Sequence, residues 1–191
     1  MPDRRAHRGP HPEDAELFAT GALGSLRDAA SDLTWLLDRG YASKSSLKLV
    51  GDRYQLAARQ RTAVGRCACS MGQREQRQSR QLTGSTLKGH DVWLDGYNVL
   101  TSIEAALAGG VILVARDGCF RDMASMHGSW RKVAETEPAI RMLGHFLAGQ
   151  GVASCRWLLD RPVSNSGRLR GLLLRQATTF GWDWTVLLET N

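Results

Sequence analysis

Residues 91–191 alternate short apolar segments with longer amphipathic ones, and this alternation restricts the fold more than any other feature of the chain. Strands that alternate with helices are typical of a mainly parallel, doubly wound sheet. We therefore expect a Rossmann-like α/β domain over residues 91–191. Its expected strands are VWLD at 92–95, VILVARDG at 111–118, ASCRWLLD at 153–160 and WDWTVLLETN at 182–191. The expected helices cover residues 99–108, 120–133 (with or without a turn), 136–151 and 164–181.

The N-terminal half predicts a small helical module over residues 23–69. Leucine and alanine recur at three- and four-residue spacings from Leu23 to Leu37, which indicates an amphipathic helix, and Gly40 is a natural C-cap for it. Two shorter helices are expected at 43–56 and 57–69. Residues 1–22 are expected to form a disordered polar tail, and residues 70–90, rich in Gln, Ser, Arg and Gly, a basic linker or exposed arm.

Composition excludes several classes of protein. There is no run of about 18 apolar residues, so no membrane-spanning segment is expected, and the polar N-terminus lacks the apolar core of a secretory signal. The cysteine spacing fits neither a zinc knuckle nor the disulfide framework of a small secreted domain. We expect reduced, mostly buried thiols in a cytoplasmic protein. The cysteines are Cys67, Cys69, Cys119 and Cys155.

The positive charge is concentrated in one stretch. Between Arg53 and His90, eight basic residues accompany a single acid, Glu75, while the whole chain has a net charge of +6. Such a stretch is suited to binding a polyanion, because neutralising phosphates releases counterions. A solvated basic linker would have the same composition, so both interpretations stay open. The residues expected to attract a nucleic-acid backbone are Arg74, Arg77 and Arg80.

Three of the expected strands end on an aspartate, namely Asp95, Asp117 and Asp160. Ligands of open parallel sheets bind outside the carboxyl ends of the strands, so these carboxylates would converge on one crevice. Mg²⁺ or Mn²⁺ would neutralise their repulsion and activate water against a phosphodiester. Asp122 would join from the next helix, and Asn98 would orient a carboxylate. The alternative is that each aspartate only caps the helix that follows it.

The segment DRPVSNSGRLR, residues 160–170, predicts a second kind of site. Pro162 fixes a turn, and small polar residues then begin a helix. The N–H groups at a helix N-terminus bind anions, and Arg170 lies just inside this one. The alternative is an ordinary Ser/Asn cap with solvated arginines. The candidate phosphate ligands are Ser164, Asn165, Ser166 and Arg168.

Several motifs resemble the bacterial and archaeal proteins grouped as domain of unknown function 434. They are DLTWLLDRGY, SLKLVGDRYQLAARQRTAVGRC, WLDGYNVLTSIEAAL, DGCFRD and LLDRPVSNSGRL, and the similarity spans about residues 25–191. The element LDGYNVL is also similar to the first strand of PIN-like and NYN nuclease domains. That resemblance implies that Asp95 is a metal ligand and Asn98 its neighbour, with Asp117 and Asp160 as later strand-end acids. It further implies an acidic segment after the last strand, so we expect a domain truncated at LLETN.

These observations favour a divalent-metal-dependent ribonuclease, or a protein derived from one. The metal would be held by Asp95, Asp117 and Asp160, with help from Asp122. Two other classes stay open. One is a non-catalytic nucleic-acid-binding module, and the other is a regulatory interaction module that docks through Trp35, Leu36 and Tyr41. The oligomeric state is not indicated.

Overall fold

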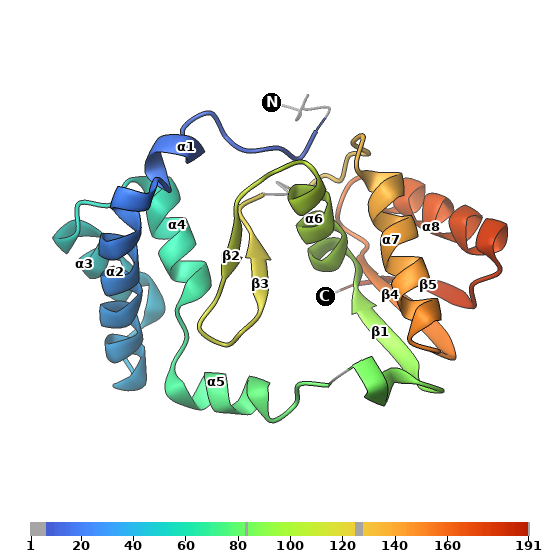
Figure 1. The fold of residues 1–191 in the computed structure, drawn as a ribbon, viewed down its shortest axis with the longest axis horizontal. Coiled ribbons are helices and arrows are strands. Elements are labelled where there is room, and N and C mark those ends of the chain that lie inside the picture. Colours follow the sequence, from blue (N-terminus) through green and yellow to red (C-terminus); the bar gives the residue numbers. More distant parts are fainter. Residues whose placement is uncertain (1–6, 83, 125–127, 191) are drawn as a thin grey trace. The chain divides into compact units, whose positions relative to one another are not determined.

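The structure, a computed structural model, describes residues 7–82, 84–124 and 128–190 (Figure 1). The chain divides into two compact units. The sheet unit comprises Met1–Gly9, Leu82–Gly109 and Ala124–Asn191. The helical unit comprises Pro10–Gln81 and Gly110–Met123. Residues 110–123 therefore belong with the N-terminal helices, although the sequence placed them in the α/β domain.

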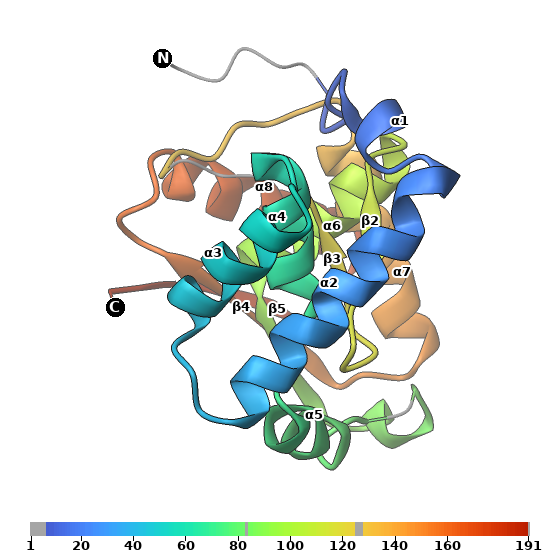
Figure 2. The ribbon, with the colours of Figure 1, turned by 90° about the vertical axis from the view of Figure 1, so that its left-hand side faces the viewer.

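The helical unit is built around α2 (Thr20–Asp38), which packs against α3 (Ser43–Arg53) and α4 (Ala58–Cys67) (Figure 2). Its core contains Ala29 and Leu33 from α2 and smaller contributions from the neighbouring helices. Gly40 has a φ of 77°, and its N–H donates to Leu37 O at 3.1 Å. The amphipathic helix and its glycine C-cap are thus confirmed. A short helix, α1 (Asp14–Leu17), precedes α2.

Part of the expected linker is helical. Residues Met71–Gln78 form α5, which has no buried residue. Its N-terminus carries a capping box, in which Ser70 Oγ accepts from Gln73 N at 3.2 Å and Gln73 Oε1 accepts from Ser70 N at 3.1 Å. Local capping defines this helix, so a search for apolar periodicity overlooks it.

A strand forms within residues 111–118 as predicted, but it does not join the parallel sheet, and the helix predicted for residues 120–133 was wrong. Strand β2 (Ile112–Val114) pairs antiparallel with β3 (Phe120–Asp122) in a separate two-stranded sheet. The Asp117–Gly118 pair makes the turn, because Gly118 adopts a φ of 82° and Asp117 Oδ1 accepts from Cys119 N at 3.1 Å. No helix forms among the described residues from 123 to 133, while 125–127 lie outside the described part.

The sheet unit contains three parallel strands in the order β1–β4–β5. This confirms a mostly parallel sheet that alternates with helices. The strands are β1 (Asp91–Asp95), β4 (Ser154–Asp160) and β5 (Trp184–Glu189). The helices are α6 (Gly96–Leu107), α7 (Thr136–Gly149) and α8 (Ser166–Phe180), and a 3-10 turn, η1 (Gly84–Leu87), precedes β1.

The core of the sheet unit lies on one face of its sheet. Cys155, Trp157 and Leu159 of β4 are buried and pack with side chains from α6, α7 and α8. On the opposite face, Trp93 is exposed and Arg156 stacks 4.5 Å from its ring centroid. Within the described residues of this unit, helices cover one face only, so the doubly wound arrangement that we expected is not present here.

The four cysteines are free thiols, as expected. Cys69 and Cys155 are buried, Cys67 is half-buried and Cys119 is exposed. In the part of the chain that the structure describes, no helix has the length and apolarity needed to cross a membrane.

Candidate anion-binding site

Each of the three parallel strands ends on an acid at the carboxyl edge of the sheet. Asp95 ends β1, Asp160 ends β4 and Glu189 ends β5. Asp95 is in register with Leu158, two residues before Asp160, and Asp160 is in register with Glu189. The three acids therefore lie on the same face of the sheet. Glu189 was missed by the sequence analysis, although it ends an apolar strand in the same way as the two aspartates.

Asp95 is the N-cap of α6. Its Oδ1 accepts from Asn98 N at 3.4 Å, and its Oδ2 accepts from Asn98 Nδ2 at 2.7 Å, so Asn98 orients the carboxylate. The next residue is Gly96, because no side chain fits at this position. A Cβ at this position would lie 2.6 Å from Leu159 Cδ2 and 3.0 Å from Leu158 O. Asp95 and Asn98 are both exposed.

Tyr97 adds a hydroxyl to this edge that the sequence analysis did not single out. Its side chain is buried, and its oxygen has no hydrogen-bond partner in the described structure. Burial, with a smaller contribution from the nearby negative charge of Asp160, raises the pKa of Tyr97 to about 12. The hydroxyl therefore stays protonated at neutral pH.

Asp117 and Asp122 lie on the hairpin of the helical unit and not on the parallel sheet. Asp117 is buried and accepts from Arg121 at 2.7 and 2.9 Å and from Arg77 at 2.6 Å. The hydrogen bonds from Arg121 hold the pKa of Asp117 well below its usual value. Asp122 forms an ion pair with Arg66 at 3.7 Å.

The four aspartates expected to share a metal are thus divided between the two units. The antiparallel hairpin is the reason, because it removes residues 111–118 from the parallel sheet. Within the described ranges, no group of three or more His, Cys, Asp or Glu side chains has the geometry to hold a metal ion.

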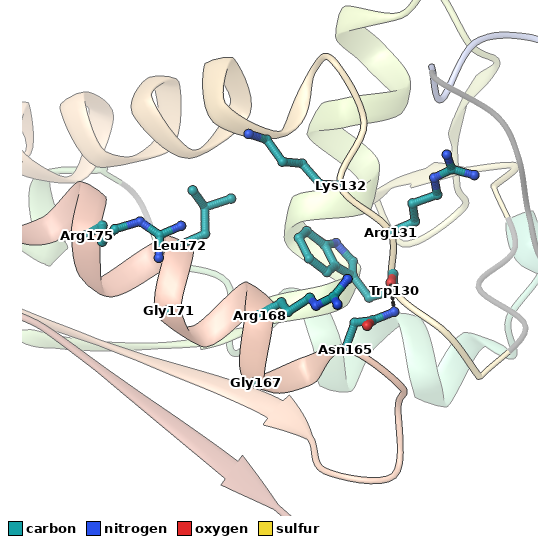
Figure 3. A pocket seen from close by; sticks show the side chains of 9 residues that line it. All are labelled: Trp130, Arg131, Lys132, Asn165, Gly167, Arg168, Gly171, Leu172 and Arg175. Carbon is teal, nitrogen blue, oxygen red and sulfur yellow. Dashed lines mark hydrogen bonds between the residues drawn. The ribbon is translucent and has the colours of Figure 1, made fainter.

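A cavity of about 510 Å³ opens beside the N-terminus of α8 in the sheet unit (Figure 3). Two loops form its mouth and are bonded to each other. Trp130 N donates to Ser164 O at 2.9 Å, Ser164 N donates to Gly128 O at 3.0 Å, and Asn165 Nδ2 donates to Trp130 O at 3.0 Å. We call this cavity the anion pocket. It is lined by Trp130, Arg131, Lys132, Asn165, Gly167, Arg168, Gly171, Leu172 and Arg175.

The lining of the anion pocket is strongly cationic. Four basic side chains contribute to it, and none of its lining residues is acidic. Glu137 is one nearby counter-charge, since it pairs with Lys132 and with Arg141. Asn165 occupies the N-cap position in a left-handed conformation with a φ of 69°, but its amide bonds to the neighbouring loop. No described side chain caps the first turn of α8, and Gly167 of that turn lines the pocket.

Trp130 supplies a buried donor to the same pocket. The residue is 3% exposed, and its Nε1 has no hydrogen-bond partner in the described part of the chain. Buried N–H groups are nearly always satisfied in native proteins. Figure 3 shows the indole of Trp130 with Lys132 and Arg168 around the same hollow. An acceptor bound in the pocket would satisfy this donor.

The structure brings only part of the expected phosphate ligands together. Asn165 and Arg168 line the anion pocket, whereas Ser164 and Ser166 do not. Ser164 is exposed, and Ser166 is buried with its hydroxyl 3.4 Å from Arg161 O. Arg175 was not predicted from the sequence, although it lies seven residues after Arg168 and thus on the same helical face. Arg131 and Lys132, which follow Trp130, were not predicted either, because that segment was expected to be helical.

Carboxylates of the helical unit pair with much of the basic stretch. Arg59 donates to Asp14 at 2.9 Å, and Arg61 donates to Asp52 at 2.8 Å. These ion pairs therefore neutralise part of the net positive charge that an open basic arm was expected to carry. Further pairs in this unit are Arg53 with Asp32, Arg66 with Asp122 and Arg77 with Asp117. Arg74 is half-buried on α5, and Arg80 is exposed just beyond it.

The surface expected for an interaction module is partly exposed. Trp35 and Tyr41 are 54% and 59% exposed, and Arg39 stacks 3.5 Å from the centroid of the Trp35 ring. Leu36 packs against the core of the helical unit instead.

Comparison with known families places the chain among proteins without an assigned activity. The family described as "Domain of unknown function (DUF5616)" matches residues 84–191, which is more than half of the chain. The chain belongs to that family. The family described as "Protein of unknown function (DUF434)" matches residues 25–80, which confirms the resemblance of the N-terminal motifs over this range.

An uncharacterized protein from Methanocaldococcus jannaschii is 26% identical to the chain over 167 residues, which cover 87% of this chain and 80% of that protein. No solved structure matches the chain. The similarity of LDGYNVL to PIN-like domains is not among these matches and stays a hypothesis.

Proposed function

We propose that the sheet unit binds the phosphate backbone of RNA in the anion pocket. The observation that carries this proposal is the convergence of four cationic side chains, the first turn of α8 and the unpartnered Nε1 of Trp130 on one cavity. Phosphate oxygens are acceptors that satisfy all three kinds of group.

The spread of the cations favours a chain of phosphates over a single one. Gly167 and Arg175, at the two ends of the α8 lining, are eight residues apart, which corresponds to about 12 Å along the helix. Arg131 and Lys132 extend the cationic lining onto the neighbouring loop. One phosphate group would reach only part of this surface.

The test is a titration of the full chain with a short, fluorescently labelled, single-stranded RNA at several salt concentrations. We expect affinity to fall steeply with salt. In a plot of the logarithm of the binding constant against the logarithm of the salt concentration, the slope should be about −0.7 for each phosphate contact. The double variant Arg168→Gln/Arg175→Gln should bind RNA more weakly, and the magnitude of its slope should be smaller by about 1 to 1.5. Arg170→Gln is the matched control, because Arg170 is exposed on the same helix but does not line the pocket.

Equal binding by the double variant and the Arg170→Gln control would refute the proposal. A single-stranded DNA of the same sequence shows whether the 2′-hydroxyl contributes. Phosphate contacts alone predict similar affinity for both strands.

A second candidate function is a divalent-metal-dependent ribonuclease of PIN-like type. It is favoured by the placement of Asp95, Asp160 and Glu189 on one face of the sheet at its carboxyl edge. In this proposal Asp95 and Asp160 hold Mg²⁺ or Mn²⁺, and Asn98 orients Asp95. The metal would polarise the scissile phosphate and activate a water molecule.

Mn²⁺ titration by calorimetry tests this second candidate. Asp95→Asn should abolish binding while leaving α6 intact, because Asn and Asp are equally good N-caps. Asp183→Asn is the control, since Asp183 is exposed before β5 at the opposite end of the strand. If the wild type neither binds Mn²⁺ nor cleaves RNA, the ribonuclease is excluded and RNA binding by the anion pocket is unaffected.

A further inference from the structure

A second cavity lies entirely within the helical unit. It has a volume of about 510 Å³ and is bounded by α2, α4 and β2, which can be followed in Figure 2. Its apolar walls include Leu23, Leu26, Val64, Ile112 and Leu113. We call it the groove pocket.

One face of α2 forms the long wall of the groove pocket. The lining positions run from Leu23 to Thr34 at three- and four-residue spacings, so they form one stripe along the helix. This stripe is about 16 Å long. Leu33, which faces the core of the unit, is not part of it. The groove pocket therefore has the length and apolarity to take an extended apolar chain.

Two of the residues that line the groove pocket each have a buried polar atom without a hydrogen-bond partner among the described residues. Thr34 is 2% exposed, and its Oγ1 makes no hydrogen bond within the described structure. Thr62, Thr178 and Thr179, which also lie in helices, donate to the carbonyl four residues earlier at 2.9 to 3.0 Å. Thr34 does not make this bond to Ala30, although both residues line the pocket.

Arg116 provides the second of these atoms. Its Nε is buried without a hydrogen-bond partner in the described residues, and its side chain lines the same cavity. A buried guanidinium N–H without an acceptor is costly. Arg27 also contributes a positive charge to the lining, and no acidic residue lines the pocket. The lining thus presents donors and positive charge inside an apolar groove.

We infer that the groove pocket binds an amphipathic monocarboxylate with an unbranched apolar chain. The carboxylate accepts from Arg116 Nε and Thr34 Oγ1, and the chain lies along the stripe of α2. A carboxylate suits this site because a guanidinium offers it charge-assisted hydrogen bonds in a planar arrangement. This inference is independent of RNA binding, because every lining residue belongs to the helical unit.

The experiment is a calorimetric titration of the full chain with decanoate. We expect binding of one molecule per chain, and an affinity that falls about fourfold for each methylene removed in a series of shorter carboxylates. Decanol, which has the same chain without the charge, should bind at least tenfold more weakly than decanoate.

Two variants locate the carboxylate. Arg116→Met should weaken decanoate binding at least tenfold, and Thr34→Val should weaken it about threefold to tenfold. Thr34→Val keeps the shape of the side chain and removes an unsatisfied hydroxyl, so its melting temperature without ligand should equal or exceed that of the wild type. Lys44→Met is the control for loss of one charge, because Lys44 is exposed on α3 and does not line the pocket.

The inference is overturned if decanoate does not saturate the wild type at one molecule per chain. It is also overturned if Thr34→Val and Lys44→Met bind decanoate equally well. The Thr34→Val result decides the question even if Arg116→Met does not fold.

Discussion

A buried ion pair in the sheet unit offers a sharp test of the electrostatic reasoning. Glu104 of α6 is 0% exposed and accepts from Arg8 Nε at 2.9 Å and from Thr136 Oγ1 at 2.6 Å. Arg8 is itself 4% exposed. Arg8→Met preserves most of the apolar stem but leaves the Glu104 carboxylate buried with only one donor. Removing one partner of a buried pair costs about 3–5 kcal/mol, which is a large share of the stability of a typical domain.

The assay is urea unfolding followed by tryptophan fluorescence in a Trp35→Phe background, because Trp35 is the one tryptophan of the helical unit. With a urea dependence of about 2 kcal/mol per molar, the transition midpoint should fall by about 2 M. Adding Glu104→Gln to Arg8→Met removes the stranded charge, so we expect the double variant to regain about half of the loss.

The effect should also depend on pH. Burial raises the pKa of Glu104 above its usual value, against opposing hydrogen bonds from Thr136 and Arg8. The folded state therefore binds the carboxyl proton of Glu104 more tightly than the unfolded state does. The stabilisation that results from this difference is lost as the pH rises through the pKa of Glu104 in the folded state. Without Arg8 the pKa rises further, so Arg8→Met should cost less at pH 5 than at pH 7. A loss below about 1 kcal/mol, or an equal loss at both pH values, would contradict a buried ion pair between Arg8 and Glu104.

Two other outcomes follow from the packing and the charges. Gly144→Ala should destabilise the sheet unit by about 1–3 kcal/mol, because a Cβ at this position would lie 2.2 Å from the ring of Trp182. The control is Gly149→Ala, which should leave the urea midpoint nearly unchanged because there is open space around Gly149. Hydrogen bonds from Arg121 lower the pKa of Asp117. The ionised Asp117 side chain should therefore add about 2 kcal/mol to the free energy of unfolding above the usual aspartate pKa, and this stabilisation should disappear as the pH falls through the lowered pKa. Asp117→Asn should remove this acid-dependent part of helical-unit stability, measured by Trp35 fluorescence, and an unchanged pH profile would count against the ion pair.

Elements with strong local signals could be predicted from the sequence. Helix α2 and its end at Gly40 follow from periodicity and a glycine C-cap, and the parallel strands follow from apolar runs of strand length. Asn165 and Arg168 were identified because a turn and a helix start are visible in consecutive residues. Each of these signals depends on neighbours along the chain, which is why no tertiary information was needed.

The hairpin and the ion pairs depended on contacts that the sequence does not display. The run at 111–118 has the composition of a buried parallel strand, but the Asp117–Gly118 turn folds it back onto β3. Asp117 then pairs with Arg77, forty residues earlier in the chain. A strand-end aspartate and a hairpin aspartate look alike until their partners are known.

Local sequence patterns were enough to predict a helical module, parallel strands that end on acids, and two lining residues of the anion pocket, Asn165 and Arg168. That Trp130, Arg131 and Lys132 line the same cavity depends on the tertiary structure, since hydrogen bonds between two loops far apart in the sequence hold them there. The tertiary structure also decided that the acids divide between two units and that Thr34 and Arg116 share one cavity. The physical reason is that helix and strand periods are local, whereas the environment of a charged or polar group is set by whatever the folded chain packs against it.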